Sequence, residues 1–301
     1  MILSISNISL QKIESTLLTQ KKINLSILRL DKIHEHVSGN KLFKLHFYVE
    51  ECLQSDHKTM LTFGGAYSNH LVATAFLCNQ KNIKSIGIVR GEEPAQLSHT
   101  LHKCKAFGMQ LQFISREEYI NINNDAEYLS LKKMYGDCTI VSEGGYGYLG
   151  AKGASLIMDI LKNENPSYVC TCVGTATTLA GLCMNKIGSE KIIAIPVIKN
   201  MMDIFTRIEA LTQLSAEKDL IVFNDYHFGG YAKHNEELIN FMNQFYINYN
   251  VPTDIIYTAK MMYGMMDKIA NNYFEKESKI VCIHTGGLQG NYSLPTGTLV
   301  F

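Results

Sequence analysis

Short apolar runs alternate with longer amphipathic stretches along most of the chain. The runs are bounded by glycine and lack the polar alternation of a half-exposed strand. They lie at residues 60–63, 85–89, 111–114, 168–173, 192–197 and 279–283. Strands that are apolar on both faces and separated by helices form mostly parallel sheets covered by helices. The pattern therefore predicts a three-layer α/β architecture.

Length and composition set the scale of the molecule. With 301 residues, of which 46% are hydrophobic, the chain is long enough to bury a large core in one or two domains, and we expect two. No fixed-period repeat, low-complexity tract or charge run marks a linker. Domain boundaries must therefore be inferred from the order of the loops.

The charge balance is neutral, with 28 Lys and Arg residues against 28 Asp and Glu residues. No net field draws such a protein to nucleic acid or to an anionic membrane. The segment Met1–Gln20 lacks the apolar core of a signal peptide, and no apolar run reaches the roughly 18 residues of a membrane-spanning helix. We expect a cytoplasmic protein that acts on small molecules.

Eight cysteines are scattered along the chain without a CxxC pair or a histidine cluster at metal-binding spacing. Cys170 and Cys172 alternate along a strand-like run and should share one face. Two residues on one strand provide too few ligands for a metal. We therefore expect buried, packed cysteines and no metal site.

A lysine stands where a turn enters a predicted helix. Gly39 permits unusual backbone angles, Asn40 is a polar turn residue, and an apolar helical pattern begins at Leu42, directly after Lys41. A solvated surface lysine is the ordinary alternative. A lysine partly desolvated at such a junction loses its charge more easily and becomes a nucleophile.

Loops that follow strands are the places where α/β sheets bind ligands. Residues 174–178 join a strand to a helix through a glycine and three threonines, which predicts a cradle for a single phosphate, with simple helix capping as the alternative. Neither a Walker loop nor a GxGxxG fingerprint is present there. Residues 64–69 lead into a helix near Ser68, whose hydroxyl and amides suit a carboxylate, although a capped turn fits equally well.

Seven segments, in order, resemble motifs of the 1-aminocyclopropane-1-carboxylate deaminase and D-cysteine desulfhydrase family of pyridoxal-phosphate enzymes. The resemblance runs from about Ile27 to about Tyr292. The segments are SGNK at 38–41, TFGGAYSNH at 62–70, VRGEEP at 89–94, SEGG at 142–145, VGTATTLAGL at 173–182, YTAK at 257–260 and HTGG at 284–287. The resemblance implies the tryptophan synthase β-subunit-like fold, also called fold type II of the pyridoxal-phosphate enzymes.

The same resemblance implies two domains, a small one at residues 48–145 and a large one made of 1–47 plus 146–301, with the substrate between them. It implies pyridoxal 5'-phosphate as cofactor and a homodimer as the assembly. In it Lys41 forms the internal aldimine and Asn69 faces the phenolic oxygen of the cofactor. The cofactor-binding residues are then Lys41, Asn69, Gly174, Thr175, Ala176, Thr177, Thr178 and Thr285.

The resemblance also assigns residues to the substrate. The substrate carboxylate would contact Ser68, Asn69 and His70. A phenol near a desolvated cation acts as an acid or a base, so Tyr231 and Tyr257 are candidate active-site residues, although packing is the alternative for each. The catalytic residues that we expect are Lys41, Ser68, Tyr257 and Tyr231.

Two positions bear on the reaction. Deaminases of the family resemble one another in a glutamate after the motif tyrosine and an aliphatic residue before the final Gly-Gly, where this chain has Thr258 and Thr285. A hydroxyl cannot hold a ring proton as a carboxylate does, so prompt loss of a β-leaving group is favoured. A third departure is Ala176-Thr177, because family members usually carry glycines there.

We therefore expect a pyridoxal-phosphate-dependent lyase that catalyses β-elimination on a small D-amino acid, converting D-cysteine to pyruvate, ammonia and sulfide. Ring-opening of 1-aminocyclopropane-1-carboxylate to 2-oxobutanoate and ammonia is the alternative within the family. A non-catalytic protein that binds an anionic metabolite at helix termini is the alternative of another class.

Overall fold

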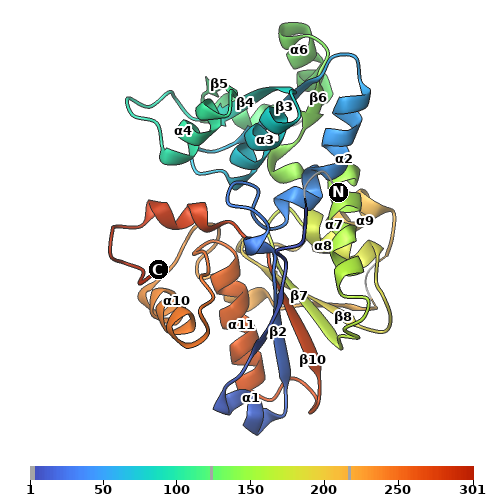
Figure 1. Ribbon diagram of the computed structural model, residues 1–301, viewed down its shortest axis with the longest axis vertical. Helices are drawn as coiled ribbons and strands as arrows, with labels where there is room; N and C mark the ends of the chain where they lie inside the picture. Colours follow the sequence, from blue (N-terminus) through green and yellow to red (C-terminus); the bar gives the residue numbers. More distant parts are fainter. Residues whose placement is uncertain (1–3, 123–124, 216–217) are drawn as a thin grey trace.

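Two sheets, one above the other in Figure 1, organise the chain in the computed structural model, which describes residues 4–122, 125–215 and 218–301. Each of the six predicted apolar runs forms a strand. The strands are β1 (Leu10–Ile13), β2 (Asn24–Arg29), β3 (Thr59–Gly64), β4 (Lys84–Arg90), β5 (Gln110–Ile114), β6 (Thr139–Val141), β7 (Tyr168–Val173), β8 (Lys191–Pro196), β9 (Leu220–Val222) and β10 (Lys279–His284).

Parallel pairing dominates both sheets. The lower sheet has the order β1-β2-β10-β7-β8-β9, and within it only β1 and β2 pair antiparallel. The upper sheet has the order β5-β4-β3-β6 and is parallel throughout. The predicted α/β class with mostly parallel sheets is confirmed, and the carboxyl ends of the parallel strands within each sheet lie along one edge.

Helices cover both faces of the six-stranded sheet and give it the predicted three layers. The helices of the chain are α1 (Thr16–Lys21), α2 (Lys41–Gln54), α3 (Asn69–Gln80), α4 (His99–Ala106), α5 (Arg116–Asn121), α6 (Asp125–Tyr135), α7 (Tyr148–Ile160), α8 (Thr177–Met184), α9 (Ile204–Thr212), α10 (Glu236–Tyr249) and α11 (Thr258–Ala270). Buried residues of α2, α7, α8 and α9 pack on one face of the sheet, and those of α1, α10 and α11 pack on the other.

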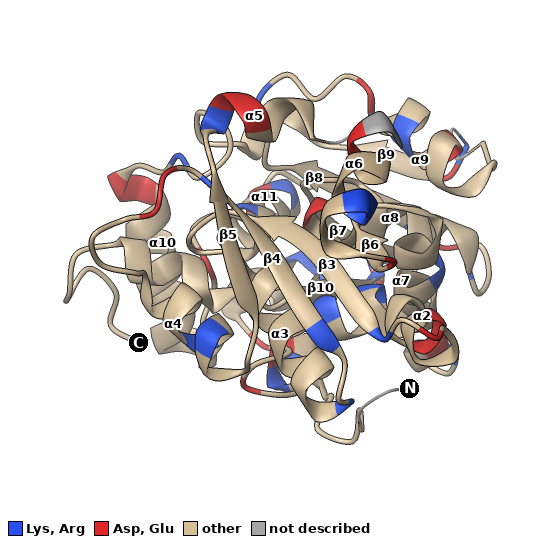
Figure 2. Ribbon diagram, turned by 90° about the horizontal axis from the view of Figure 1, so that it is seen from above, with Lys and Arg blue, Asp and Glu red and all other residues tan. Residues whose placement is uncertain are grey.

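The four-stranded sheet is also buried on both sides. Leu61 and Ile86 face α5 and α6, whereas Val89 lies with the buried residues of α3 and α4. Figure 2 looks down on this sheet, and in that view the positions of Lys and Arg are interspersed along the ribbon with those of Asp and Glu. The division into two sheets agrees with two domains, and the boundaries at 47/48 and 145/146 stay a prediction.

Helix α2 connects the two halves of the molecule. It begins at Lys41, after the loop that follows β2 of the large sheet, and the next element of the chain is β3 of the small sheet. Phe43 of α2, Met60 of β3 and Leu77 of α3 belong to one buried cluster with residues of α7 and α8. The first residue of α2 is thereby placed at the junction between the sheets.

The cysteines and the helices bear on two further expectations. All eight cysteines are free thiols; seven are buried, and Cys183 is half-buried. Cys170 and Cys172 pack in the same cluster, as predicted. Across the part of the chain that the structure describes, no helix has both the length and the apolar character to cross a membrane.

Candidate active site

Turns that follow three strands meet the start of α2 at the junction of the two sheets. Lys41 opens α2, and Ser68 caps α3 after β3. Residues 174–178 connect β7 to α8, and residues 285–287 follow β10. These are the carboxyl ends of parallel strands, where α/β sheets bind their ligands.

Lys41 is held by its neighbour. Its Nζ atom donates a hydrogen bond to Asn40 Oδ1 at 2.7 Å, and Asn40 Nδ2 donates to Thr178 Oγ1 at 2.8 Å. Burial lowers the pKa of Lys41 to about 8. About a tenth of the amine is then neutral at pH 7, which is about 300-fold more than for an ordinary lysine. The side chain suits a nucleophile, and the surface-lysine alternative does not fit.

Gly39 brings the lysine turn against the loop after β10. The backbone N–H of Asn40 donates to Thr285 O at 3.1 Å, and Gly39 N donates to Leu30 O at 2.9 Å. Gly39 has φ +70°, and a Cβ placed on it would overlap the carbonyl group of Thr285 and the amide nitrogen of Gly286. The close approach of the two backbones therefore requires glycine.

A buried polar network supports the loop after β10. His284 Nε2 lies 2.6 Å from Pro252 O, and the amide of Gly286 donates to His284 Nδ1 at 3.2 Å. Asp31, which forms a buried ion pair with Arg29 at 2.6 Å, lies 3.5 Å from the same ring nitrogen. Since the carbonyl of Pro252 can only accept, His284 carries its proton on Nε2, and Nδ1 is left to accept from the loop.

The start of α3 contributes three of the predicted residues. The Ser68 hydroxyl accepts from Leu71 N at 3.3 Å as the N-cap, and Asn69 Nδ2 donates to Gly287 O at 3.3 Å. Asn69 Oδ1 is buried and has no hydrogen-bond partner among the described residues. The His70 side chain lies deeper, with Nε2 2.8 Å from the Thr62 hydroxyl.

The predicted phosphate loop turns sharply into α8. Ala176 precedes the helix with φ 65° and ψ −2°, and Thr177 is its first residue. The hydroxyls of Thr175 and Thr177 lie 2.9 Å apart. The first backbone N–H groups of a helix have no acceptor within it and carry positive partial charge. The loop therefore fits an anion, and positive φ occurs at Ala176 but not at Thr177.

The left-handed conformation of Ala176 leads to a prediction. Replacing Ala176 with glycine should stabilise the protein by about 0.5–1 kcal/mol, because a Cβ is unfavourable in this region. Ala180, inside α8, is the matched control, and its replacement with glycine should destabilise by about 1 kcal/mol. Urea unfolding of both variants checks this, and an equal loss of stability in the two would contradict it.

Lys44 is a site residue that the sequence analysis missed. It is only 4% exposed, and no carboxylate of the described residues lies within ion-pair distance of it. Burial, together with the nearby charge of Lys41, holds the pKa of Lys44 well below its ordinary value. A buried amine without a counterion fits a site that receives an anionic ligand, because the charge of the ligand would favour the protonated amine. Its place inside the apolar run after Lys41 was the available signal.

The two predicted tyrosines meet on the other side of the site. Tyr257 Oη donates to Tyr231 Oη at 3.4 Å, and the rings pack edge to face with centroids 6.0 Å apart. A Cβ on Gly174 would lie 3.2 Å from the ring of Tyr257. Burial raises the pKa of the Tyr257 phenol, which is therefore protonated at neutral pH, whereas Tyr231 is about half exposed, at 49%.

The two threonines that distinguish this chain differ in their bonding. Thr258 Oγ1 donates to Asp254 Oδ1 at 2.7 Å and accepts from Asp254 N at 2.8 Å, so its proton is already engaged. Asp254 is fully buried and accepts further hydrogen bonds from three consecutive amides, beginning at Ile256. Thr285 Oγ1 has the Cys172 thiol 3.3 Å away. Thr285 is therefore the freer hydroxyl of the two.

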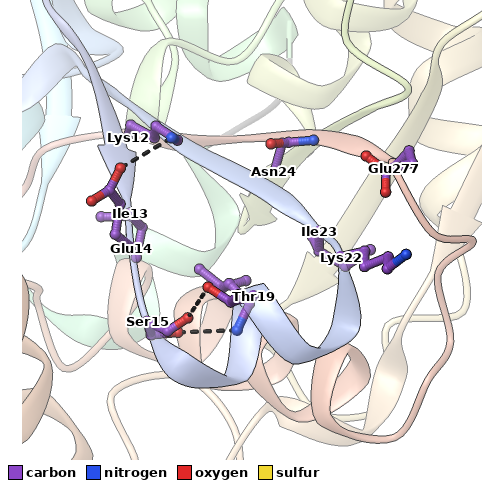
Figure 3. Close-up of a pocket in the computed structure, with 10 residues that line it drawn as sticks. Lys12, Ile13, Glu14, Ser15, Thr19, Lys22, Ile23, Asn24 and Glu277 are labelled. Carbon is purple, nitrogen blue, oxygen red and sulfur yellow. Dashed lines mark hydrogen bonds and ion pairs between the residues drawn. The ribbon is translucent and has the colours of Figure 1, made fainter.

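A separate pocket of about 440 Å³ lies at the opposite edge of the large sheet, beside α1 (Figure 3). Lys12 and Glu14 pair across 3.0 Å at its rim, and Asn24 and Glu277 lie at the amino ends of β2 and β10. Ligands of parallel sheets bind at the carboxyl ends of strands, so this pocket is not the candidate active site.

The predicted site residues thus come together, and their surroundings can be compared with the cofactor that the sequence suggests. The site combines an amine of lowered pKa, a helix N-terminus with hydroxyls, a second buried cation and an unpartnered amide oxygen. This donor set fits a phosphate and an aldehyde. A model of the family described as "Pyridoxal-phosphate dependent enzyme" matches residues 13–286.

The chain belongs to this family of pyridoxal-phosphate-dependent enzymes. Its cofactor is pyridoxal phosphate, and it is an enzyme. The match includes the predicted Lys41 turn, the loop before α8 and the strand β10. The role of each single residue remains a prediction.

Relatives and solved structures agree with this assignment. The chain is 29% identical to the bifunctional D-cysteine desulfhydrase/1-aminocyclopropane-1-carboxylate deaminase of Arabidopsis thaliana over 293 residues, covering 88% of this chain and 73% of that protein. It is 26% identical to the D-cysteine desulfhydrase of Klebsiella pneumoniae over 271 residues, covering 83% of each chain. A crystal structure of a homologue of 1-aminocyclopropane-1-carboxylate deaminase superposes with a TM-score of 0.78 at 20% identity, covering 96% and 92% of the two chains. These comparisons confirm the predicted family and fold.

Proposed function

We propose that the protein eliminates the β-substituent of a small D-amino acid, with D-cysteine as the model substrate. The observation that supports this choice is the state of the two threonines. A glutamate in place of Thr258 would bring a second carboxylate against the buried Asp254. The Thr258 hydroxyl instead donates a hydrogen bond to that residue. No carboxylate at position 258 is then available to hold a proton on the cofactor ring, which favours rapid loss of a leaving group over a long-lived carbanion.

Pyridoxal phosphate supplies an aldehyde that condenses with amines and a ring that withdraws electrons from the substrate Cα. Lys41 holds the cofactor in the resting protein and then, as a neutral amine, removes the α-proton of the substrate. Its lowered pKa supports this role, since an ordinary lysine would be protonated at neutral pH. Ser68 and the backbone amides at the start of α3 receive the substrate carboxylate.

The elimination breaks the Cα–H and Cβ–S bonds and releases sulfide with the bonding electrons. Hydrolysis of the remaining three-carbon enamine consumes one water and gives pyruvate and ammonia. Tyr257 is the preferred donor of a proton to the departing sulfur, because its ring lies beside Gly174 at the predicted cofactor loop and its phenol is within hydrogen-bonding distance of Tyr231. If Tyr257→Phe leaves turnover unchanged, the tyrosine is a packing residue.

A substrate panel tests the proposal. Purified protein is supplied with D-cysteine, β-chloro-D-alanine, L-cysteate and 1-aminocyclopropane-1-carboxylate, and keto acid and sulfide are measured. We expect pyruvate from D-cysteine with a kcat/KM at least about tenfold above that for 2-oxobutanoate formation from the cyclopropane amino acid. Rapid ring-opening without elimination would reverse this ranking.

Two controls separate the remaining alternatives. A protein that only binds an anionic metabolite would form no keto acid from any of the four compounds, although it would remain folded and bind pyridoxal phosphate. Keto acid formation that disappears in Lys41→Ala but persists in a variant of an exposed lysine, Lys105→Ala, assigns the chemistry to the site.

A further inference from the structure

A chain of hydrogen bonds fixes the protonation of His70. Thr62 Oγ1 donates to Val141 O at 2.7 Å, and His70 Nε2 lies 2.8 Å from the same hydroxyl. A hydroxyl has one proton, and the carbonyl of Val141 cannot donate. The proton between Thr62 and His70 must therefore belong to the histidine, which is the Nε2–H tautomer.

The other ring nitrogen is left without a proton. His70 is 2% exposed, and burial together with the charges of Lys41 and Lys44 holds its pKa well below the ordinary value. The ring is therefore neutral, and Nδ1 is a bare acceptor. Nδ1 is buried and has no hydrogen-bond partner among the described residues, which is costly for a polar atom unless a donor faces it.

Lys44 shares the space beside His70. Both side chains border Gly145, whose φ is +74°. From the position where a Cβ of Gly145 would stand, Lys44 Cε is 3.4 Å away and His70 Cε1 is 3.6 Å away. The helix α2 thus places a buried amine without a counterion next to a ring from α3 that has an unused acceptor. Within the described structure, the Lys44 amine has no acceptor to donate to, and His70 Nδ1 has no donor.

We propose that His70 is a positioning residue: its bare Nδ1, which has no partner in the described structure, accepts a hydrogen bond from the Lys44 ammonium once an anionic ligand is bound, and so keeps Lys44 charged beside that ligand. An acceptor for the charged form favours protonation of a buried amine, which opposes the effect of burial. The inference rests on the cofactor phosphate as the anion, and it is independent of which amino acid is the substrate.

The proposal narrows one expectation from the sequence. A bare ring nitrogen repels a carboxylate, so the His70 side chain is not a ligand of the substrate carboxylate. The backbone N–H of His70, in the first turn of α3, remains available for that contact.

The tautomer is tested directly by long-range ¹H–¹⁵N NMR of the holoenzyme with labelled histidine. We expect His70 to be neutral with its proton on Nε2 from about pH 5.5 to 8, where an ordinary histidine titrates. Thr62→Val removes the hydroxyl that fixes the proton on His70 Nε2, so the variant should also show the Nδ1–H form of His70. Thr139→Val is the matched control, because its hydroxyl pairs with His57 Nε2 at 3.2 Å in the same sheet. An imidazolium or an Nδ1–H form of His70 in the unmodified protein would overturn the proposal.

The link to Lys44 is tested by release of pyridoxal phosphate from the holoenzyme in equilibrium dialysis. His70→Leu should weaken cofactor retention about 10- to 100-fold, as for the loss of a hydrogen bond to a charged group. His70→Gln, which can donate to Thr62 and still present an acceptor, should restore most of it. As the pH is raised, cofactor retention should also begin to fall at a lower pH in His70→Leu than in the unmodified protein. Without the acceptor, the Lys44 ammonium loses its proton at a lower pH.

Equal cofactor retention and equal pH profiles in folded His70→Leu and in the unmodified protein would contradict the positioning role of His70. If His70→Leu does not fold, Thr62→Val gives the answer, since a released tautomer places a proton on Nδ1 and should weaken retention in the same direction. None of these measurements uses D-cysteine, so the proposed substrate can fail while this inference stands.

Discussion

Lys41→Ala should abolish keto acid formation, with a loss on the order of 10³-fold or more, because both the attachment of the cofactor and the removal of the α-proton need this amine. Borohydride treatment of the unmodified holoenzyme should add the mass of the reduced cofactor to the peptide that contains Lys41. The same peptide of the variant should stay unmodified in the mass spectrum.

The pH dependence of cofactor capture tests the same residue. Only the neutral amine attacks an aldehyde, so the rate at which cofactor-free protein captures pyridoxal phosphate should rise with pH as Lys41 loses its proton. Since burial lowers its pKa to about 8, the rise should level off near that pH instead of near 10. Lys105→Ala should behave as the unmodified protein. Capture that is unaffected in Lys41→Ala would remove the basis of the proposed chemistry.

Gly39→Ala should destabilise the protein by about 3–5 kcal/mol, which combines a left-handed backbone with a steric overlap. The added Cβ would overlap the carbonyl of Thr285 and the amide of Gly286, and neither backbone group can rotate away as a side chain can. The turn before Lys41 and the loop after β10 would have to separate. We expect weakened cofactor binding as well as a lower urea midpoint.

Gly108→Ala provides the matched control for Gly39→Ala. Gly108 also has positive φ, at +81°, but a Cβ there would meet no atom within 4 Å. Only the backbone term applies, so its cost should be about 1 kcal/mol. Comparable losses of stability in the two variants would show that the overlap with the Thr285 loop is relieved without strain.

The sequence predicts the strands that are apolar on both faces, because burial leaves a continuous run of hydrophobic residues. It does not predict β6 (Thr139–Val141) or β9 (Leu220–Val222), which have three residues each and no periodicity to detect. It also does not predict β1, an edge strand whose four residues include Gln11 and Lys12. Pairing with β2 decides that conformation, and pairing is not visible in a local pattern.

The site residues divide in the same way. Lys41, Ser68 and the loop at 174–178 lie in turns with unusual residue types, and such turns can be recognised from the sequence. Asp254 cannot, because an isolated aspartate is normally exposed and only the tertiary packing shows that it is buried. For Lys44 the one signal is its place inside the apolar run after Lys41. Tertiary structure also decides that the Thr258 hydroxyl is hydrogen-bonded to Asp254, whereas the Thr285 hydroxyl has, among the described residues, only the Cys172 thiol beside it.

The eight free thiols can serve as probes of local and global unfolding of the chain. Burial raises the pKa of Cys104 and of the half-buried Cys183 to about 12, and a thiol that keeps its proton reacts slowly with disulfide or maleimide reagents. Labelling therefore waits for local or global unfolding. The order in which cysteines of the two sheets become modified would reveal which half of the molecule loosens first.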